Sequence, residues 1–222
     1  MASTIHYQAC PICASESIEK LHVAKDHTVS GESFEVWRCA KCSGGFTQNV
    51  PDAATIGPYY AAESYVSHTD SDKGFINNLY HKVRRFSLLT KKKLVTNLVQ
   101  KPTGRLLDIG AGTGAFVHTM QTGGWQVTGL EPDATAAKQA LQKYNIQLQP
   151  ANNIYTLEAA QFDAITMWHV LEHVHDLHGY FKRFSELLQP SGVLVIAVPN
   201  YTSTDANIYG HHWAALEDAL GR

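Results

Sequence analysis

The sequence of 222 residues predicts an α/β fold, in which a small cysteine-rich module precedes a domain built on a parallel sheet. Two observations predict it. All four cysteines lie near the N-terminus in two Cys-x-x-Cys pairs. Further along the chain, a short apolar run leads directly into a glycine-rich loop and then into a stretch compatible with a helix, as a strand of a parallel sheet does. At this length, one full domain and one smaller module are expected.

The composition is that of an ordinary globular protein. Apolar residues make up 44% of the chain and charged residues 17%, so a sizeable core can be buried and dominant disorder is excluded. The net charge of −2 gives no overall basic field, which makes a small molecule the default partner and disfavours nucleic acid. No apolar run reaches the roughly 18 residues of a membrane-spanning helix, and the N-terminus lacks a signal sequence. We therefore expect a cytoplasmic protein without membrane segments.

The cysteine pairs predict a zinc ribbon over residues 1–50. In a reducing compartment, cysteines spaced in this way favour metal over disulfides. Two such pairs can bring four thiolates to the corners of a tetrahedron, which suits a closed, structural Zn²⁺ site. Strand-like runs at Ile18–Val23 and Phe34–Trp37 lie between the pairs. Two redox dithiols or four free thiols are the alternatives. The metal ligands would be Cys10, Cys13, Cys39 and Cys42.

A helical connector is expected over residues 51–100. Between Phe75 and Val99, apolar residues recur at helical spacing, and we expect them to form one stripe that faces a core. The members of that stripe are Ile76, Leu79, Tyr80, Val83, Phe86, Leu94 and Leu98. The basic residues Arg84, Arg85 and Lys91–Lys93 would gather on the other side, as a solvated face or as a dock for a polyphosphate or RNA. Before the helix, Tyr65 and His68 could cover a bound cofactor as a lid or simply pack.

The run Arg105–Ile109 predicts a buried strand, and the loop after it predicts a binding site. Its glycines allow a ligand to approach the backbone without a Cβ in the way. A second strand ends at Leu130, which places the carboxylate of Glu131 at the edge of the sheet where ligands of α/β folds bind. That carboxylate can accept hydrogen bonds from both hydroxyls of a ribose, or it can merely cap the next helix. The loop glycines are Gly110, Gly112 and Gly114.

The spacing of the glycines bears on which ligand is bound. The loop reads D-x-G-x-G-x-G, whereas the dinucleotide fingerprint is G-x-G-x-x-G, so the third glycine comes one position early. This spacing disfavours a dehydrogenase.

Four runs resemble the class I S-adenosylmethionine-dependent methyltransferases, in the order and at the spacing of that family. They are Leu106–Gly114, Gly129–Asp133, Phe162–Val174 and Leu188–Ile196. The cysteine pairs and the aromatic connector resemble a bacterial subgroup in which a zinc ribbon precedes the methyltransferase domain. The resemblance implies a Rossmann-like methyltransferase sheet over residues 101–222, with S-adenosylmethionine as the cofactor and Zn²⁺ in a structural role.

The resemblance also implies roles for individual residues. The three loop glycines would line the methionine moiety, Asp108 would support the loop, and Glu131 would hold the ribose. Further cofactor contacts would come from Pro132, Asn152 and Trp168. Asn152 stands where the family usually has an acidic residue beside the adenine.

The family sheet has seven strands, and the sequence indicates five. They lie near residues 105–109, 126–130, 146–149, 163–168 and 193–198. The domain is therefore expected to be incomplete at its C-terminal side.

His169-Val-Leu-Glu172-His173 admits two interpretations. It matches the H-x-x-E-H signature of inverted zincin proteases, which requires both histidines on one helix. In a methyltransferase, His169 would lie at the end of the fourth strand as a general base, and His173 either assists it or pairs with the backbone.

The acceptor would be a small metabolite, such as a sugar nucleotide or another glycan or natural-product precursor. The alternatives are a degenerate, non-catalytic cofactor-binding module and an RNA methyltransferase. The sequence does not indicate an oligomeric state.

Overall fold

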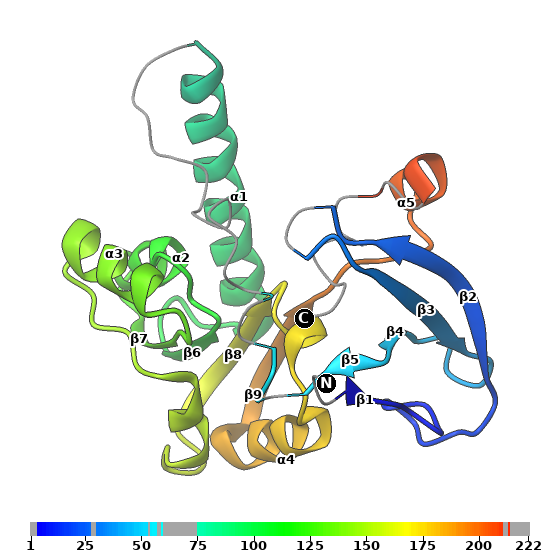
Figure 1. The fold of residues 1–222 in the computed structure, drawn as a ribbon. Coiled ribbons are helices and arrows are strands. Elements are labelled where there is room, and N and C mark those ends of the chain that lie inside the picture. The colour runs from blue at the N-terminus through cyan, green and yellow to red at the C-terminus, as the bar shows by residue number, and fades with distance from the viewer. Residues whose placement is uncertain are drawn as a thin grey trace. The chain divides into compact units, whose positions relative to one another are not determined.

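The computed structural model describes residues 4–27, 30–52, 54–56, 59, 75–210 and 213, with the backbone alone for 75–80. These residues form two compact units (Figure 1). The first unit takes its described residues from 1–68, 172–178 and 198–222. The second takes them from 69–171 and 179–197.

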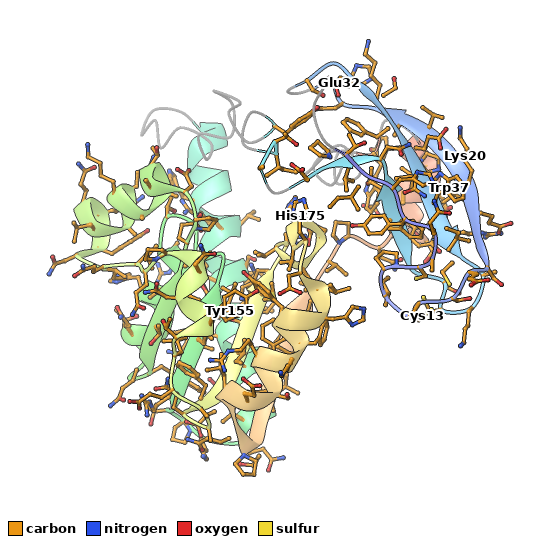
Figure 2. The ribbon with its side chains drawn as sticks, turned by 60° about the horizontal axis from the view of Figure 1, so that its bottom comes forward. Cys13, Lys20, Glu32, Trp37, Tyr155 and His175 are labelled. Carbon is orange, nitrogen blue, oxygen red and sulfur yellow. The ribbon has the colours of Figure 1, made fainter. Side chains whose placement is uncertain are left out.

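The first unit contains the predicted ribbon. A three-stranded antiparallel sheet has the order β2-β3-β4, and a short strand near the N-terminus pairs with β5. The strands are β1 (Thr4–Ile5), β2 (Ile18–Lys25), β3 (Ser33–Cys39), β4 (Gly45–Gln48) and β5 (Val50–Pro51). Both strands predicted between the cysteine pairs are confirmed. Lys20 and Trp37 lie on neighbouring strands, and both donate to the carboxylate of Glu35 (Figure 2).

The segment after residue 198 packs on this ribbon. The helix α5 (Thr204–Tyr209) contributes Ala206 to a hydrophobic cluster that also contains Trp213 and, from the ribbon strands, Phe34. The Tyr201 hydroxyl donates a hydrogen bond of 2.6 Å to the carbonyl of Ser43, beside the second cysteine pair. The described residues of the C-terminal segment therefore complete the core of the first unit.

The second unit is built on a parallel sheet of four strands in the order β7-β6-β8-β9 (Figure 1). Its strands are β6 (Arg105–Ile109), β7 (Gln126–Leu130), β8 (Phe162–Trp168) and β9 (Leu188–Ala197). This confirms the predicted α/β class and four of the predicted strands. The strand predicted over 146–149 is wrong, because only an isolated bridge joins Gln149 to Leu130 in the described structure. Pro150 comes directly afterwards and has no N–H with which to continue the pairing.

Helices cover the sheet and connect its strands. They are α1 (Phe75–Val99), α2 (Ala115–Gln121), α3 (Ala134–Tyr144) and α4 (Leu177–Leu187), with 3₁₀ turns η3 (Ala151–Tyr155) and η4 (Leu171–His173). The Asp133 side chain caps α3 by accepting a hydrogen bond from the N–H of Thr135. Among the described helices, none has the length and apolar character needed to cross a membrane.

The bounds of α1 are as predicted, but the predicted buried face is wrong for those members of the stripe whose side chains the structure describes. The side chains of Ile76, Leu79 and Tyr80 lie outside the described residues. Val83 and Phe86 are 59% and 72% exposed, and Leu94 and Leu98 are also exposed. The helix packs instead through Leu88, Val95 and Val99, on a cluster that includes α2 and the sheet. Arg84 and Lys91 lie on this same packed face and are half-buried. Their long aliphatic stems can cover apolar surface while their charged ends reach a polar site.

Candidate functional site

The strand order indicates a candidate binding site at the carboxyl ends of β6 and β8. From β6 the chain continues to β7 on one side, and it then crosses to β8 on the other side of β6. Ligands of open α/β sheets bind at such a point of reversal. The glycine loop follows β6 there, and Trp168 ends β8. The glycine loop directly follows a buried strand, as the sequence predicted, and the binding of a ligand there stays a prediction.

The loop glycines at 110 and 112 meet different needs. Gly110 has φ +71°, and a Cβ on it would lie 2.2 Å from Cγ2 of Val170. Gly112 has φ +54°, but a Cβ there would meet no atom within 4 Å. The N–H groups of Gly110 and Ala111 both bond to the carbonyl of Leu130, which fixes the loop against β7. Gly110 therefore allows close packing, whereas Gly112 faces open space into which a ligand can come close to the backbone.

Glu131 lies beside this loop, as the sequence predicted. Its Oε2 accepts a hydrogen bond of 2.6 Å from the N–H of Gly112, and its Oε1 accepts one of 2.9 Å from the N–H of Asp133. Burial raises the pKa of Glu131, and these two backbone donors act in the opposite direction. Each carboxylate oxygen retains a lone pair after these bonds, so the group is positioned to accept two further hydroxyl donors.

Asp108 lies on β6 just before the glycine loop. Its side chain is buried at the end of β6 and accepts a hydrogen bond of 2.6 Å from the hydroxyl of Thr166 on β8. Desolvation raises the pKa of Asp108 to about 7, against the lowering effect of Thr166 and of Lys91. Between pH 6 and 8 the charge of this group therefore responds to any cation placed near it.

Lys91 reaches this region from α1. Its Nζ lies 4.5 Å from the centroid of the Trp168 ring, which also packs edge-on against Phe116 of α2. Burial lowers the pKa of Lys91, while Asp108 raises it. A cavity of about 340 Å³ lies here, and the residues that line it include Lys91, Thr113 and Phe116.

The remaining predicted site residues are more dispersed. His169 follows β8 with φ +59°, its side chain is exposed, and its N–H bonds to the carbonyl of Ala197 at 2.9 Å. Pro132 and Asn152 are exposed, and Asn152 belongs to η3. His173 ends η4 in the first unit and is half-buried. Tyr65 and His68 lie outside the described residues.

The metalloprotease interpretation is wrong for the H-x-x-E-H run. His169 follows a strand, and His173 ends a three-residue 3₁₀ turn, so the two histidines do not lie one turn apart on an α-helix. That arrangement is what an inverted zincin needs to hold its metal.

Comparison with known proteins decides the family. Residues 80–221, more than half of the chain, match a family described as methyltransferase domain. The chain belongs to this methyltransferase family. A ubiquinone biosynthesis O-methyltransferase of Rhodopseudomonas palustris (strain TIE-1) is 33% identical over 102 residues, which are 43% of this chain and 40% of that protein. One from Methylocella silvestris is 32% identical over 104 residues, 44% of this chain and 41% of that protein.

Among solved structures, a SAM-dependent methyltransferase of Archaeoglobus fulgidus is 24% identical. It matches 59% of this chain and 61% of that chain, with a TM-score of 0.46. The chain spans about 40% of the length of the two O-methyltransferases from Rhodopseudomonas and Methylocella.

The sequence analysis did not predict several residues that surround this candidate site. Lys91, Arg84 and Thr166 are not among the predicted site residues, although Lys91 and Arg84 belong to the predicted basic face. Their positions on α1, with Leu88 and Val95, follow helical spacing as closely as the predicted stripe does. Thr166 could have been found from strand alternation, since it occupies the pleat position that pairs with Asp108.

The four cysteines of the methyltransferase chain come together in the first unit. Their sulfur atoms all lie within 4.8 Å of one another, with Cys10 and Cys42 separated by 3.7 Å and Cys13 and Cys39 by 3.6 Å. A tetrahedral site with Zn–S bonds of about 2.3 Å has edges of about 3.8 Å. The separations of 3.7 and 3.6 Å match this edge length and exceed the length of a disulfide bond.

The two Cys-x-x-Cys turns have the same backbone geometry. The N–H of Ala14 bonds to the carbonyl of Cys10, and the N–H of Ser43 bonds to that of Cys39. Ala14 and Ser43 both take a positive φ, of 57° and 59°. The backbone N–H of Cys42 is the main cause that lowers the pKa of Cys39 to about 6. The lowered pKa favours the thiolate form of Cys39, which is the form that binds a metal, whereas burial and the neighbouring thiols raise the pKa of Cys42 to about 12. Figure 2 shows Cys13 at the opposite end of the unit from Glu32.

Proposed function

We propose that this chain is a methyltransferase that uses S-adenosylmethionine and acts on a small molecule. The observation that carries the proposal is the pairing of Glu131 with the N–H of Gly112 beside an open glycine loop. A carboxylate fixed in this way suits the two hydroxyls of an adenosyl ribose, and the glycines leave room for the methionine chain. Membership of a methyltransferase family supports the same conclusion.

The other predicted residues take their roles around this pair. Pro132 lies just after β7, and Asn152 lies in the turn η3. We assign both residues to the adenine end of the cofactor. Asp108 and Trp168, at the ends of β6 and β8, are assigned to the methionine end, where a carboxylate and an aromatic face both favour a cation. Gly110 and Gly114 hold the loop in shape, and Tyr65 and His68 remain assigned to a lid from the sequence alone.

S-adenosylmethionine supplies a methyl group on a positively charged sulfur, which an acceptor atom displaces in line. Most of the acceleration of such a step comes from holding the two reactants in alignment. The residues of the loop and Glu131 fix one reactant. His169, exposed directly after β8, is assigned as the general base that takes a proton from the acceptor, with His173 as the second candidate.

The acceptor is proposed to be a small metabolite with a hydroxyl group. The relatives in Rhodopseudomonas and Methylocella are named O-methyltransferases, which supports oxygen as the acceptor atom. Sugar nucleotides and other glycan or natural-product precursors carry such hydroxyls. The ribbon is proposed to hold one structural Zn²⁺ through its four cysteines, since the sulfur separations match a zinc tetrahedron.

The proposal is tested by transfer of a labelled methyl group from S-adenosylmethionine. The acceptor panel contains catechols, sugar nucleotides and transfer RNA, and the variants are His169→Asn, His173→Asn and Glu131→Gln. We expect methylation of a small acceptor, a fall in kcat of about 10²–10⁴ for His169→Asn with little change in cofactor affinity, and weakened cofactor binding for Glu131→Gln. Methylation of transfer RNA alone, or binding of the cofactor without transfer to any acceptor class, would contradict it.

A further inference from the structure

A second and larger cavity lies in the same unit, and Glu131 does not line it. Its volume is about 450 Å³, and the helices α1, α2 and α3 line it. Figure 1 shows these three helices grouped on one side of the sheet. The lining residues are His81, Arg84, Arg85, Leu88, Leu89, His118, Thr119, Thr122, Lys143 and Tyr144. No residue that has a role in the proposed methyl transfer lines this cavity.

The charged side chains that line the cavity are basic. Five of its side chains are basic, and they come from three different helices: His81, Arg84, Arg85, His118 and Lys143. The described residues that line the cavity include no Asp or Glu. The chain as a whole carries a net charge of −2, so this is a local concentration of positive charge rather than a reflection of the composition. Guanidinium and ammonium groups that converge on one cavity are the donors that proteins use for phosphate.

The wall of the cavity is also held in place. The ring of His118 stacks on that of Tyr144 with centroids 4.5 Å apart, and Nζ of Lys143 lies 5.6 Å from the Tyr144 ring. The hydroxyls of Thr119 and Thr122 donate to backbone carbonyls of their own helix. The basic groups are therefore the ones that are suited to bind a ligand in this cavity.

We propose that this cavity binds the phosphate or diphosphate group of a small molecule. Its volume exceeds what inorganic phosphate alone would fill, which suits a phosphate carried on a larger ligand. The cavity adjoins the smaller one beside the glycine loop, since Arg84 and Leu88 line both. Arg84 also donates a hydrogen bond of 3.3 Å to the hydroxyl of Thr113 in that loop.

The phosphate has two possible sources. It can belong to a separate phosphorylated effector, or it can be part of the methyl acceptor, anchored here while the rest reaches the cofactor. The second source rests on the proposed function. The shared chemistry is a phosphate ester or diphosphate.

The first experiment is calorimetric titration of the full chain with inorganic pyrophosphate. The test variants are Arg85→Gln and Lys143→Gln, because neither residue lines the smaller cavity beside the glycine loop. The matched controls are Lys93→Gln on α1 and Lys138→Gln on α3, which do not line the cavity. We expect one pyrophosphate per chain, about tenfold weaker binding for each test variant, and less than about a twofold change for each control. Affinity should also fall as salt is added.

Failure of this site is distinguishable from failure of the proposed function. Each protein is also titrated with S-adenosylhomocysteine, and its thermal unfolding is measured to confirm an intact fold. Binding of S-adenosylhomocysteine without pyrophosphate binding, or equal weakening by test and control variants, overturns the phosphate site. Pyrophosphate binding that is lost only in the test variants supports the site even if S-adenosylhomocysteine does not bind.

A kinetic comparison distinguishes the two sources. A phosphorylated acceptor and its dephosphorylated counterpart are assayed with Arg85→Gln. A higher KM for the phosphorylated acceptor alone assigns the phosphate to the acceptor. An unchanged KM for both, together with lost pyrophosphate binding, assigns it to an effector.

Discussion

Replacing Gly110 by alanine tests the interpretation of the glycine loop most sharply. The backbone φ of +71° costs an L-residue about 1–2 kcal/mol. The new Cβ would lie 2.2 Å from Cγ2 and 3.1 Å from Cγ1 of Val170, and overpacking of this kind costs about 1–3 kcal/mol. The Gly110→Ala variant should therefore lose about 2–5 kcal/mol of its free energy of unfolding.

Three further variants separate these contributions: Val170→Ala, its combination with Gly110→Ala, and Gly112→Ala. Val170→Ala removes both methyl groups that the new Cβ would meet, so the double variant should recover the overpacking part and keep the backbone strain. Gly112→Ala, with no atom within 4 Å of its Cβ, should lose only about 1–2 kcal/mol of stability. It should nevertheless weaken S-adenosylhomocysteine binding, because its methyl group occupies the space that the ligand needs.

Urea unfolding followed by tryptophan fluorescence measures the wild type, the three single variants and the double variant, and calorimetry measures their ligand affinity. The reasoning would be refuted by a Gly110→Ala variant within about 0.5 kcal/mol of the wild type. A double variant no more stable than Gly110→Ala would refute it too.

Three other predictions concern groups elsewhere in the chain. Burial raises the pKa of Asp108 to about 7, so the folded chain holds the proton of this carboxyl group more tightly than the unfolded chain does. The protonated group therefore stabilises the fold fully below pH 4, and this contribution is lost as the pH rises through 7. Asp108→Asn should therefore flatten the fall in urea midpoint between pH 5 and 7.5, and an unchanged slope contradicts this. Val95→Ala should lower the free energy of unfolding by about 2 kcal/mol, whereas Leu94→Ala on the exposed face of α1 should change it by less than about 0.5 kcal/mol. Urea unfolding measures both variants, and equal losses would contradict the observed packing of the helix. Protein purified with zinc should contain one Zn²⁺ per chain by atomic emission, and Cys13→Ser should lower that content; four freely reactive thiols in the wild type would rule out the metal site.

The parts of the fold that the sequence predicts well are those with a strong local cause. The strand, loop and helix from Arg105 to Gln121 follow from an apolar run and from glycines that only certain turns require. The full length of α1 follows from apolar residues at broadly helical spacing in a run without proline or glycine. The strands β2 and β3 follow from their position between the two Cys-x-x-Cys pairs.

The parts that the sequence predicts poorly depend on distant contacts. The buried face of α1 could not be chosen, because Arg84 and Lys91 look solvent-exposed until the polar site beneath them is known. The short run before Pro150 resembles a strand, yet its pairing is limited to one bridge because the proline cannot donate a further hydrogen bond. The packing of Trp213 and Ala206 on the ribbon joins segments far apart in the chain, which no local pattern indicates.

Calorimetric titration of S-adenosylhomocysteine into the wild type and the Glu131→Gln variant tests the central claim most directly. The carboxylate is held by the N–H groups of Gly112 and Asp133, and an amide can replace its shape but not its charge or its full acceptor capacity. We predict one molecule bound per chain and an affinity about 10–100-fold weaker in the variant, at a similar unfolding midpoint. The absence of binding to the wild type, or equal affinity in both proteins, would contradict the assignment of this loop and carboxylate to an adenosyl cofactor.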